Sequence, residues 1–459
     1  MCGIFCIFST LTNNDVLSAK YKICKPYLKR RGPDCYTDLK ITISDYTFTF
    51  AAGILWLQGE NLVKQPLESN KSIFVFNGDL FGGNISDEDR KVYGDTILLY
   101  EKLEKAASIV GVLSSLQGPY ALIYLNKKNF KLYFGRDIFG RRSLLIGKVE
   151  DGFIITSVAT KCIDCIELPA IGIFSYDLLS KELILTPWSF RNNNFTTKLK
   201  ELEHFLSCDI AVNEELHVVS YKEFCEPTKT DTEFLNRIKL PFDKVFAELL
   251  NNGMFFNNVT KLHVILEAAV AKRISTQPKY CKRCIILKES CHHALVGVLF
   301  SGGLDCTILA LLADKFTDAF QVLLVGMGAD ELFGGYSRHR AALKRNGWLG
   351  LYNSLNEDWQ NISHRNLARD DRVVSDHGRQ LRTPYLDENV VDFVRDLNCW
   401  EKTCPFSDIP AGVGDKILLR TLGYHMGLQT VSSFKKRALQ FGSKIANSKE
   451  NACDVSPRL

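Results

Sequence analysis

The stretch Val-Leu-Phe-Ser-Gly-Gly-Leu-Asp-Cys, residues 298–306, organises the second half of the chain. The apolar run 295–300 predicts a buried parallel strand, and the run 304–315 predicts the helix that follows it. Gly302 and Gly303 let backbone N–H groups approach an anion, and the N-terminus of the following helix adds partial positive charge. The stretch therefore predicts a phosphate site, with a plain turn as the alternative.

Two further side chains fit this interpretation. Ser301 offers a hydrogen-bond donor, and Asp305 offers a carboxylate for a metal ion that neutralises phosphates. A Ser-Gly-Gly turn alone is a weak signal, so its weight depends on motifs elsewhere in the chain.

The composition is that of a soluble globular protein with two or three domains, because 46% of the 459 residues are hydrophobic and 24% are charged. The net charge of +5 has no long Lys/Arg run, so neither nucleic acid nor an acidic membrane is indicated as a partner. We expect a cytoplasmic protein, because no apolar stretch approaches about 20 residues and the N-terminus lacks a signal-peptide pattern. The 15 cysteines are odd in number and scattered, which favours a reducing compartment over a disulfide framework.

Cys2 follows the initiator Met1, and removal of the methionine would place a thiol and an α-amine on one residue. Such an amine, with a pKa near about 8, can act as base for the thiol, as in N-terminal nucleophiles. The alternative is a buried thiol in a first strand at 2–8.

The first half of the chain reads as a layered sheet domain, because short β-type runs separated by turn clusters outnumber helical runs. The β-type runs lie at 41–50, 72–76, 120–125, 131–134 and 153–157, and one helical run lies at 95–105.

Several motifs in order carry a family resemblance. MCGIF, RRGPD, FNGDLF, GDTILLY and FGRDIFGRRSLL resemble the class II glutamine amidotransferase domain. Together with VLFSGGLDC, GADELFGGYSRHR, RTPYLDE and the segment around Lys436, they make the whole chain resemble asparagine synthetase. GRRSLL, GYSRHR, DDRVVSDHG and KKRALQFGS look closest to the asparagine synthetase domain-containing proteins.

The resemblance implies Cys2 as the thiolate that attacks the glutamine side-chain amide. Asn77 and the Gly78 N–H would form the oxyanion hole, and Asp95 would pair with the α-ammonium of glutamine. Asn-Gly is also the preferred pair of a hairpin turn, which is the structural alternative. The family arginine that binds the glutamine α-carboxylate falls at Ile54, and losing such a charged contact costs roughly 2–4 kcal/mol.

In the second half, the resemblance implies ATP and magnesium as cofactors. Leu299, Ser301, Gly302, Gly303, Asp305, Gly326 and Lys436 match ATP- or pyrophosphate-binding positions, and Asp305 and Asp330 match candidate magnesium ligands. Lys436 stands among other basic residues, so a solvated lysine is its alternative. Met327 stands where the family has an acid, and a thioether cannot accept a proton at neutral pH.

The spacing within the second half is short. The 25 residues from Asp305 to Asp330 suffice for one helix and one strand, at 304–315 and 320–325. A parallel crossover takes a dozen residues or more, so one βαβ unit fits and a further strand does not. We therefore expect no strand to cover an adenosine.

Cysteine pairs raise zinc as an alternative. Cys281 and Cys284 precede Cys291, His292 and His293, but this spacing is cramped for a second ligand pair, and a basic exposed loop is favoured. Cys162 and Cys165 lack a partner pair.

We therefore predict an α+β N-terminal domain of layered antiparallel sheets, of the N-terminal-nucleophile type, and an α/β nucleotide-binding domain with appended helices. Residues 1–190 form the first, 191–258 a linker or ambiguous region, and 259–459 the second, shortened between 306 and 325. The resemblance implies glutamine and aspartate as substrates, glutamine hydrolysis and ATP-dependent amidation of aspartate. The alternative is a catalytically impaired scaffold. A homo-oligomer or a protein partner stays open.

Overall fold

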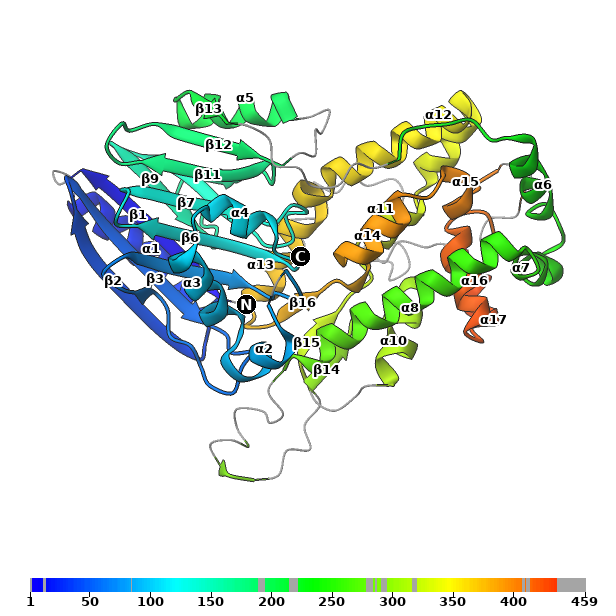
Figure 1. Cartoon of the computed structure of the whole chain (residues 1–459), viewed down its shortest axis with the longest axis horizontal. Coiled ribbons are helices and arrows are strands. Elements are labelled where there is room, and N and C mark those ends of the chain that lie inside the picture. The colour runs from blue at the N-terminus through cyan, green and yellow to red at the C-terminus, as the bar shows by residue number, and fades with distance from the viewer. Residues whose placement is uncertain are drawn as a thin grey trace.

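The computed structural model describes residues 2–10, 14–83, 85–188, 195–213, 222–277, 284, 287–289, 295–315, 320–406, 409 and 413–435. Figure 1 shows two groups of elements, with stacked sheets at the N-terminal end and mostly helices at the C-terminal end.

Two sheets stack in the N-terminal half, and within the described residues one has six strands and the other seven. The order of the first sheet is β10 (Ile166–Glu167), β8 (Leu145–Val149), β9 (Gly152–Thr156), β1 (Gly3–Thr10), β3 (Tyr46–Ile54), β2 (Cys35–Ile43). The order of the second is β13 (Ile210–Val212), β12 (Leu183–Pro187), β11 (Gly172–Asp177), β7 (Lys131–Arg136), β6 (Tyr120–Asn126), β5 (Ser72–Gly78), β4 (Leu67–Glu68). All ladders except β12–β13 are antiparallel, as expected from sequence.

Alternation along the strands decides what lies between the sheets. Ile4 and Cys6 of β1 share a buried cluster with Ile73 and Val75 of β5, so these positions form the layer between the sheets. The neighbouring positions point outward. Phe5 packs with helix α1 (Asn14–Arg31) on one side, and the outward residues of β5 pack with α3 (Asp95–Lys105) and α4 (Ile109–Ser114) on the other.

The helix predicted at 95–105 is confirmed by α3. The single strand predicted at 41–50 is wrong, because the run is part of a hairpin of β2 and β3. Its turn holds Ser44 with a positive φ of 52°, which a continuous strand does not allow. The sequence analysis also missed helix α1, whose apolar positions are too sparse for a clear helical period.

The C-terminal half is built on a parallel three-stranded sheet within the described residues, in the order β14 (Leu295–Val298), β15 (Phe320–Leu324), β16 (Gln380–Arg382). The predicted parallel strand and the helix after the turn are confirmed by β14 and α10 (Leu304–Asp314). The prediction of a buried strand over 295–300 is wrong in part, because β14 ends at Val298 and Leu299 and Phe300 are exposed. Among the described residues of this interval, 305–315 and 320–330, β15 is the one strand before Asp330, in agreement with the expected single βαβ unit.

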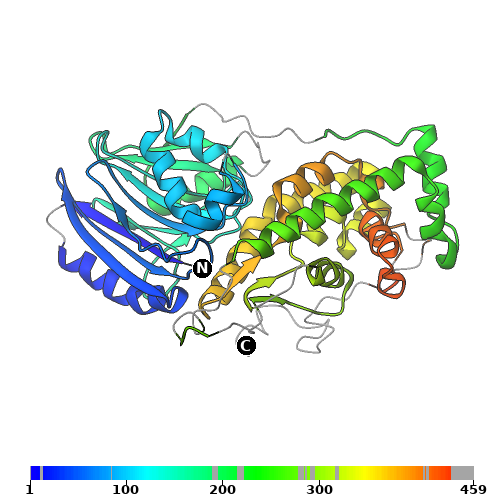
Figure 2. The same ribbon diagram turned by 60° about the horizontal axis from the view of Figure 1, so that its bottom comes forward.

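Helices surround this small sheet. Figure 2 shows the long helix α8 running along the C-terminal group, and its last turn reaches the N-terminal half, where Arg273 lies over the ring of Phe81. The helices are α8 (Gly253–Ser275), α11 (Ala329–Phe333), α12 (Ser337–Ile362), α13 (Ala368–Ser375), α14 (Glu388–Arg395), α15 (Cys399–Lys402), α16 (Ile417–His425) and α17 (Gln429–Ser432).

The region 191–258 contains more order than a linker. Its described part holds α5 (Phe195–Leu206), β13, α6 (Lys229–Arg237) and α7 (Phe242–Leu250) before α8 begins. Leu202 and Leu206 pack into the cluster between the sheets, whereas Val245 and Leu249 join the core of the C-terminal half.

Buried ion pairs join the two halves. Arg382 of β16 donates to both carboxylate oxygens of Asp79, at 2.9 and 3.1 Å. Asp371 of α13 accepts hydrogen bonds from Arg31 and Arg142, at 3.2 and 3.3 Å. All five side chains are buried. Strand β16 therefore reaches the loop that leaves β5.

Candidate functional site

The first candidate site is the cavity around Cys2. Cys2 lies one residue before β1, on the same face as Ile4, and Asn77 lies at the end of β5, on the same face as Val75. Strand alternation therefore turns both side chains toward the layer between the sheets. The Cys2 backbone N–H donates to the Asn77 side-chain oxygen Oδ1 at 3.0 Å.

This contact leaves the other end of Asn77 available. Asn77 is fully buried, and its Nδ2 has no hydrogen-bond partner among the described residues. A buried donor without a partner costs free energy, so such groups usually serve a ligand or a reacting atom. Removal of Met1 would turn the Cys2 nitrogen into an α-amine, and the hydrogen bond to Asn77 Oδ1 would keep this amine in its present position.

Asn77 and Gly78 do not form a hairpin turn, so that alternative is wrong. Both residues are still paired in the ladder with β6, Asn77 with Ala121 and Gly78 with Tyr120. A Cβ atom on Gly78 would lie 2.8 Å from the Pro119 carbonyl oxygen, so close backbone packing requires glycine.

Asp95, the first residue of α3, lines the same cavity as Cys2 and Gly78. It accepts a hydrogen bond from the Leu80 N–H at 3.0 Å. Burial, and then the neighbouring carboxylate of Asp79, raises the pKa of Asp95 to about 7. The pKa of the Cys2 thiol is also raised, chiefly by burial, so the resting thiol is protonated.

Ile54 ends β3 and lines this cavity, with 3% of its surface exposed. Ile54, the position at which the resemblance predicts an arginine, and Cys2 therefore line the same cavity. The cavity volume is about 40 Å³, which is less than the roughly 150 Å³ that holds a benzene ring. A glutamine would need the lining to move outward.

Sequence analysis missed a polar group that lines this cavity from the other half of the chain. Gln380 of β16 donates from Nε2 to Asp79. Gln58 donates to the same carboxylate at 2.6 Å. Gln380 and Asp79 lie 301 positions apart in the chain, so no local pattern could have found the pairing.

The second candidate site is a cavity of about 1180 Å³ beside the Ser-Gly-Gly turn. It brings together seven residues predicted from sequence, namely Leu299, Ser301, Gly302, Gly303, Asp305, Gly326 and Asp330. Gly302 has a φ of 71°, which favours glycine, and Gly303 caps α10. A Cβ on Gly326 would lie 2.9 Å from the Cβ of Asp305, so the two loops are in close contact. Lys436 lies outside the described residues.

Lys416 is a residue of this site that sequence analysis missed. Its Nζ lies 2.7 Å from both carboxylate oxygens of Asp305 and 2.6 Å from Oδ1 of Asp330. Burial lowers the pKa of Lys416, but the two carboxylates outweigh it and raise the pKa above its usual value. Nothing in the local sequence distinguishes Lys416 from a solvated lysine.

Magnesium fits this arrangement only after a rearrangement. Magnesium is commonly bound by one or two carboxylates together with phosphate oxygens and waters. In this structure the carboxylates of Asp305 and Asp330 both pair with one cation, the ammonium group of Lys416. Magnesium therefore stays a prediction that requires Lys416 to release a carboxylate.

Met327 lines the same cavity, where the family pattern has an acid. Glu331 is a nearby carboxylate, and burial raises its pKa. It already accepts hydrogen bonds from the Tyr336 hydroxyl at 2.6 Å and from Asn366 at 2.9 Å. Glu331 is thus a fixed part of the wall.

The zinc alternatives gain no support. Across the described ranges, no group of three or more His, Cys, Asp or Glu residues could hold a metal ion. Cys281, Cys291, His292 and His293 lie outside the described residues, and Cys284 is buried. Cys162 and Cys165 carry free thiols.

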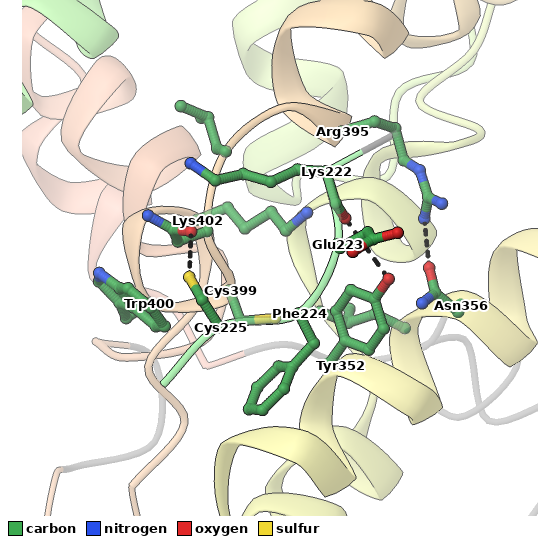
Figure 3. A pocket seen from close by; sticks show the side chains of 13 residues that line it. Lys222, Glu223, Phe224, Cys225, Tyr352, Asn356, Arg395, Cys399, Trp400 and Lys402 are labelled. Atoms are coloured by element: carbon green, nitrogen blue, oxygen red, sulfur yellow. Dashed lines mark hydrogen bonds between the residues drawn. The ribbon is translucent and has the colours of Figure 1, made fainter. Parts of the chain in front are cut away.

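Figure 3 shows a third, small cavity between the segment 222–225 and helices α12, α14 and α15. Its volume is about 20 Å³, enough for little more than a water molecule. Lys402 lies in its wall, and burial lowers the pKa of this lysine to about 8. Its Nζ donates to the Val394 carbonyl oxygen at 3.3 Å.

Comparison with known proteins identifies the family. An asparagine synthetase domain-containing protein of Drosophila melanogaster is 32% identical, with an alignment that covers all of both chains. This chain belongs to the asparagine synthetase domain-containing proteins. The human relative of the same description is 26% identical over all of this chain and 98% of its own length. The family model "Asparagine synthase" matches residues 311–358, which include β15, α11 and most of α12.

The alignment with the fly protein spans 578 positions against the 459 residues of this chain, a difference of 119. Members of the family thus carry segments that this chain lacks. Among solved structures, a glutamine phosphoribosylpyrophosphate amidotransferase from B. subtilis matches with a TM-score of 0.30, 18% identity, and coverage of 39% of this chain and 47% of that one. No helix in the described ranges is long and apolar enough to cross a membrane.

Proposed function

We propose that the chain hydrolyses the side-chain amide of glutamine at Cys2 and uses the ammonia for ATP-dependent amidation of aspartate at the second cavity. The observation that carries this proposal is the contact between the Cys2 nitrogen and Asn77 Oδ1, which leaves the Asn77 amide nitrogen without a partner beside the thiol. In this proposal, residues 1–190 are the glutaminase domain and residues 259–459 the synthetase domain.

The first reaction follows from the groups around Cys2. The α-amine freed by loss of Met1 takes the thiol proton, and the thiolate attacks the amide carbon of glutamine. The oxyanion accepts hydrogen bonds from Asn77 Nδ2 and the Gly78 N–H, each contributing about 3 kcal/mol to the transition state. Asp95 holds the α-ammonium. The α-ammonium returns its proton to the amide nitrogen, so that ammonia leaves as the thioester forms, and water then hydrolyses the thioester to glutamate and restores the thiol.

A glutamine-analogue electrophile tests this step. We expect the analogue to label Cys2 after removal of Met1, as measured by intact-mass spectrometry, and Cys2→Ala to abolish the label. Asn77→Ala should slow labelling about 100-fold, because one oxyanion donor is lost. Cys162→Ala is the matched control, since Cys162 is exposed and remote from the cavity. Equal labelling of the Cys2→Ala variant would sink the assignment.

For the second reaction, the backbone N–H groups at Gly302 and Gly303 and the Ser301 hydroxyl would bind phosphate oxygens, as donors at the N-terminus of α10 do in other phosphate sites. Lys416 pairs with Asp305 and Asp330. When a phosphate competes with these carboxylates, the Lys416 ammonium would balance the charge of pyrophosphate. Aspartate and ATP would give β-aspartyl-AMP and pyrophosphate, and ammonia would then displace AMP to give asparagine.

A second candidate function is a scaffold whose synthetase half no longer turns over. Leu299 and Phe300 are 56% and 60% exposed beside the turn, because no described strand covers them. An adenosine would then meet phosphate contacts without a wall for its base, which gives little selectivity among nucleotides.

Calorimetry and product analysis separate the two candidates. The synthetase proposal requires AMP and pyrophosphate from ATP, aspartate and ammonium, a mixture that bypasses Cys2. It also requires ATP to bind clearly tighter than GTP. Equal, weak binding of ATP and GTP with no AMP production would establish the scaffold candidate for this half. Each titration should be run with and without magnesium, because Lys416 and magnesium compete for the same carboxylates.

A further inference from the structure

A fourth cavity lies where the two halves of the chain meet. Its volume is about 140 Å³, and it is walled by α4, the loop that follows β7, the end of β12 and one side of α14. A cavity of about 150 Å³ can hold a benzene-sized molecule, so there is room for a ligand of about six heavy atoms. Neither Cys2 nor the Ser-Gly-Gly turn contributes to this cavity.

Most polar groups of the wall are already paired. Arg141 donates to Asp137 at 2.9 Å and to the Leu386 carbonyl oxygen at 2.6 Å, and it also pairs with Glu388. The Gly118 N–H donates to Glu388 at 2.8 Å. These contacts fix the wall, because a buried guanidinium between two carboxylates has a strongly preferred geometry.

Two polar side chains in the wall, Trp188 and Asp392, have no side-chain partner among the described residues. The indole nitrogen of Trp188 has no acceptor, although 97% of this residue is buried, as follows from its 3% exposure. The half-buried carboxylate of Asp392 has no hydrogen bond or ion pair in the same described part of the chain. Burial, and then Glu388 and Asp387, raises the pKa of Asp392 to about 6, so a nearby cation would relieve this carboxylate.

We propose that this cavity binds a small ammonium compound that also carries a neutral hydrogen-bond acceptor, with its ammonium on Asp392 and its acceptor on the Trp188 N–H. The wall holds three carboxylates, Asp137, Glu388 and Asp392, against one cation, Arg141. This excess of negative charge attracts an ammonium and repels a second carboxylate. An amino-acid amide therefore fits better than a free amino acid.

The ligand would contact residues 204 positions apart, from Trp188 to Asp392. Because Trp188 follows β12 and Asp392 lies on α14, a bound molecule would bridge the two halves. Binding of the folded form alone would stabilise this junction by mass action.

The test uses L-alaninamide, which has six heavy atoms, with two matched probes of the same size: L-lactamide, which replaces the ammonium by a neutral hydroxyl, and L-alanine. Ligand-observed NMR titration of the full chain measures each Kd. We expect L-alaninamide to bind at least tenfold tighter than either matched probe, because only it has the cation without a carboxylate. Asp392→Asn should weaken binding at least tenfold, because it removes the charge that pairs with the ammonium and keeps the side-chain shape. Trp188→Phe should weaken binding severalfold, because it removes the indole N–H donor together with part of the ring.

Two variants serve as controls. Asp396→Asn changes an exposed carboxylate at the end of the same helix and should leave the Kd unchanged. Asp95→Asn separates this cavity from the Cys2 cavity, where the proposed function also places an ammonium. If Asp95→Asn abolishes binding and Asp392→Asn does not, the probe sits at the glutamine site and the present proposal is overturned. Equal binding of L-lactamide overturns it as well.

Discussion

The cavity at Cys2 and the cavity beside the Ser-Gly-Gly turn differ in how much of the fold closes around them. At Cys2, two sheets of six and seven strands bury the lining, and the space is about 40 Å³. Beside the turn, a sheet of three described strands leaves Leu299 and Phe300 exposed, and the space is about 1180 Å³.

The contrast shows which contacts each site needs. Gly78 and Asp95 line the Cys2 cavity, Asn77 contacts the Cys2 nitrogen, and Ile54 stands where the resemblance predicts an arginine. The second cavity keeps its turn and both aspartates, but the single βαβ unit supplies no cover for a base. The buried sheets around Cys2 therefore hold the reacting groups in position, whereas the open turn keeps the phosphate contacts and lacks a wall for a nucleotide base.

The largest expected effect tests whether the Cys2 cavity depends on the C-terminal half. Arg382→Leu removes two hydrogen bonds to Asp79 and leaves a buried carboxylate with weaker partners. We expect the free energy of unfolding to fall by about 3–5 kcal/mol, measured by urea denaturation. Arg369→Gln breaks an exposed pair with Asp370 and should cost less than about 1 kcal/mol. Equal losses in the two variants would contradict the dependence.

Asp95→Asn tests the raised pKa of the buried carboxylate in the Cys2 cavity. The pKa of about 7 in the folded state lies above the ordinary aspartate value of 3.8, so between these pH values the folded state holds a proton that the unfolded state has lost. The stability of the wild-type chain should therefore fall as pH rises from about 4 to 7. At pH 8 the variant should be more stable by about 2–3 kcal/mol, with a weaker pH dependence. Glutamine-analogue labelling should fall in the same variant, and a variant less stable at pH 8 would refute the assignment of the raised pKa.

Ile54→Arg tests the one departure at Cys2. A guanidinium at this wall position would pair with the α-carboxylate of glutamine. We expect the rate of labelling at Cys2 to rise at least tenfold, about 1.4 kcal/mol in the barrier. A thermal melt controls for folding, because the position is buried. Unchanged labelling in a folded variant would show that Ile54 is not the carboxylate position.

The smallest effect belongs to the open turn. Leu299→Ser and Phe300→Ser replace apolar residues that are more than half exposed, so each should change the free energy of unfolding by no more than about 0.5 kcal/mol. Phe48→Ser, at a fully buried position between the sheets, should cost at least about 3 kcal/mol. A large loss at Leu299 would mean that part of the chain covers the turn in solution.

The sequence alone determined the strand, turn and helix at 295–314, the helix at 95–105 and the short βαβ spacing, because hydrophobic period and glycine position are local properties. It also named the residues that meet at Cys2 and at the turn, through motifs. Only the tertiary structure decided that Lys416 lies between Asp305 and Asp330, and that Trp188 and Asp392 share a cavity. Lys416 is 111 positions from Asp305, and pairing over such distances depends on how whole layers pack, which no local pattern records.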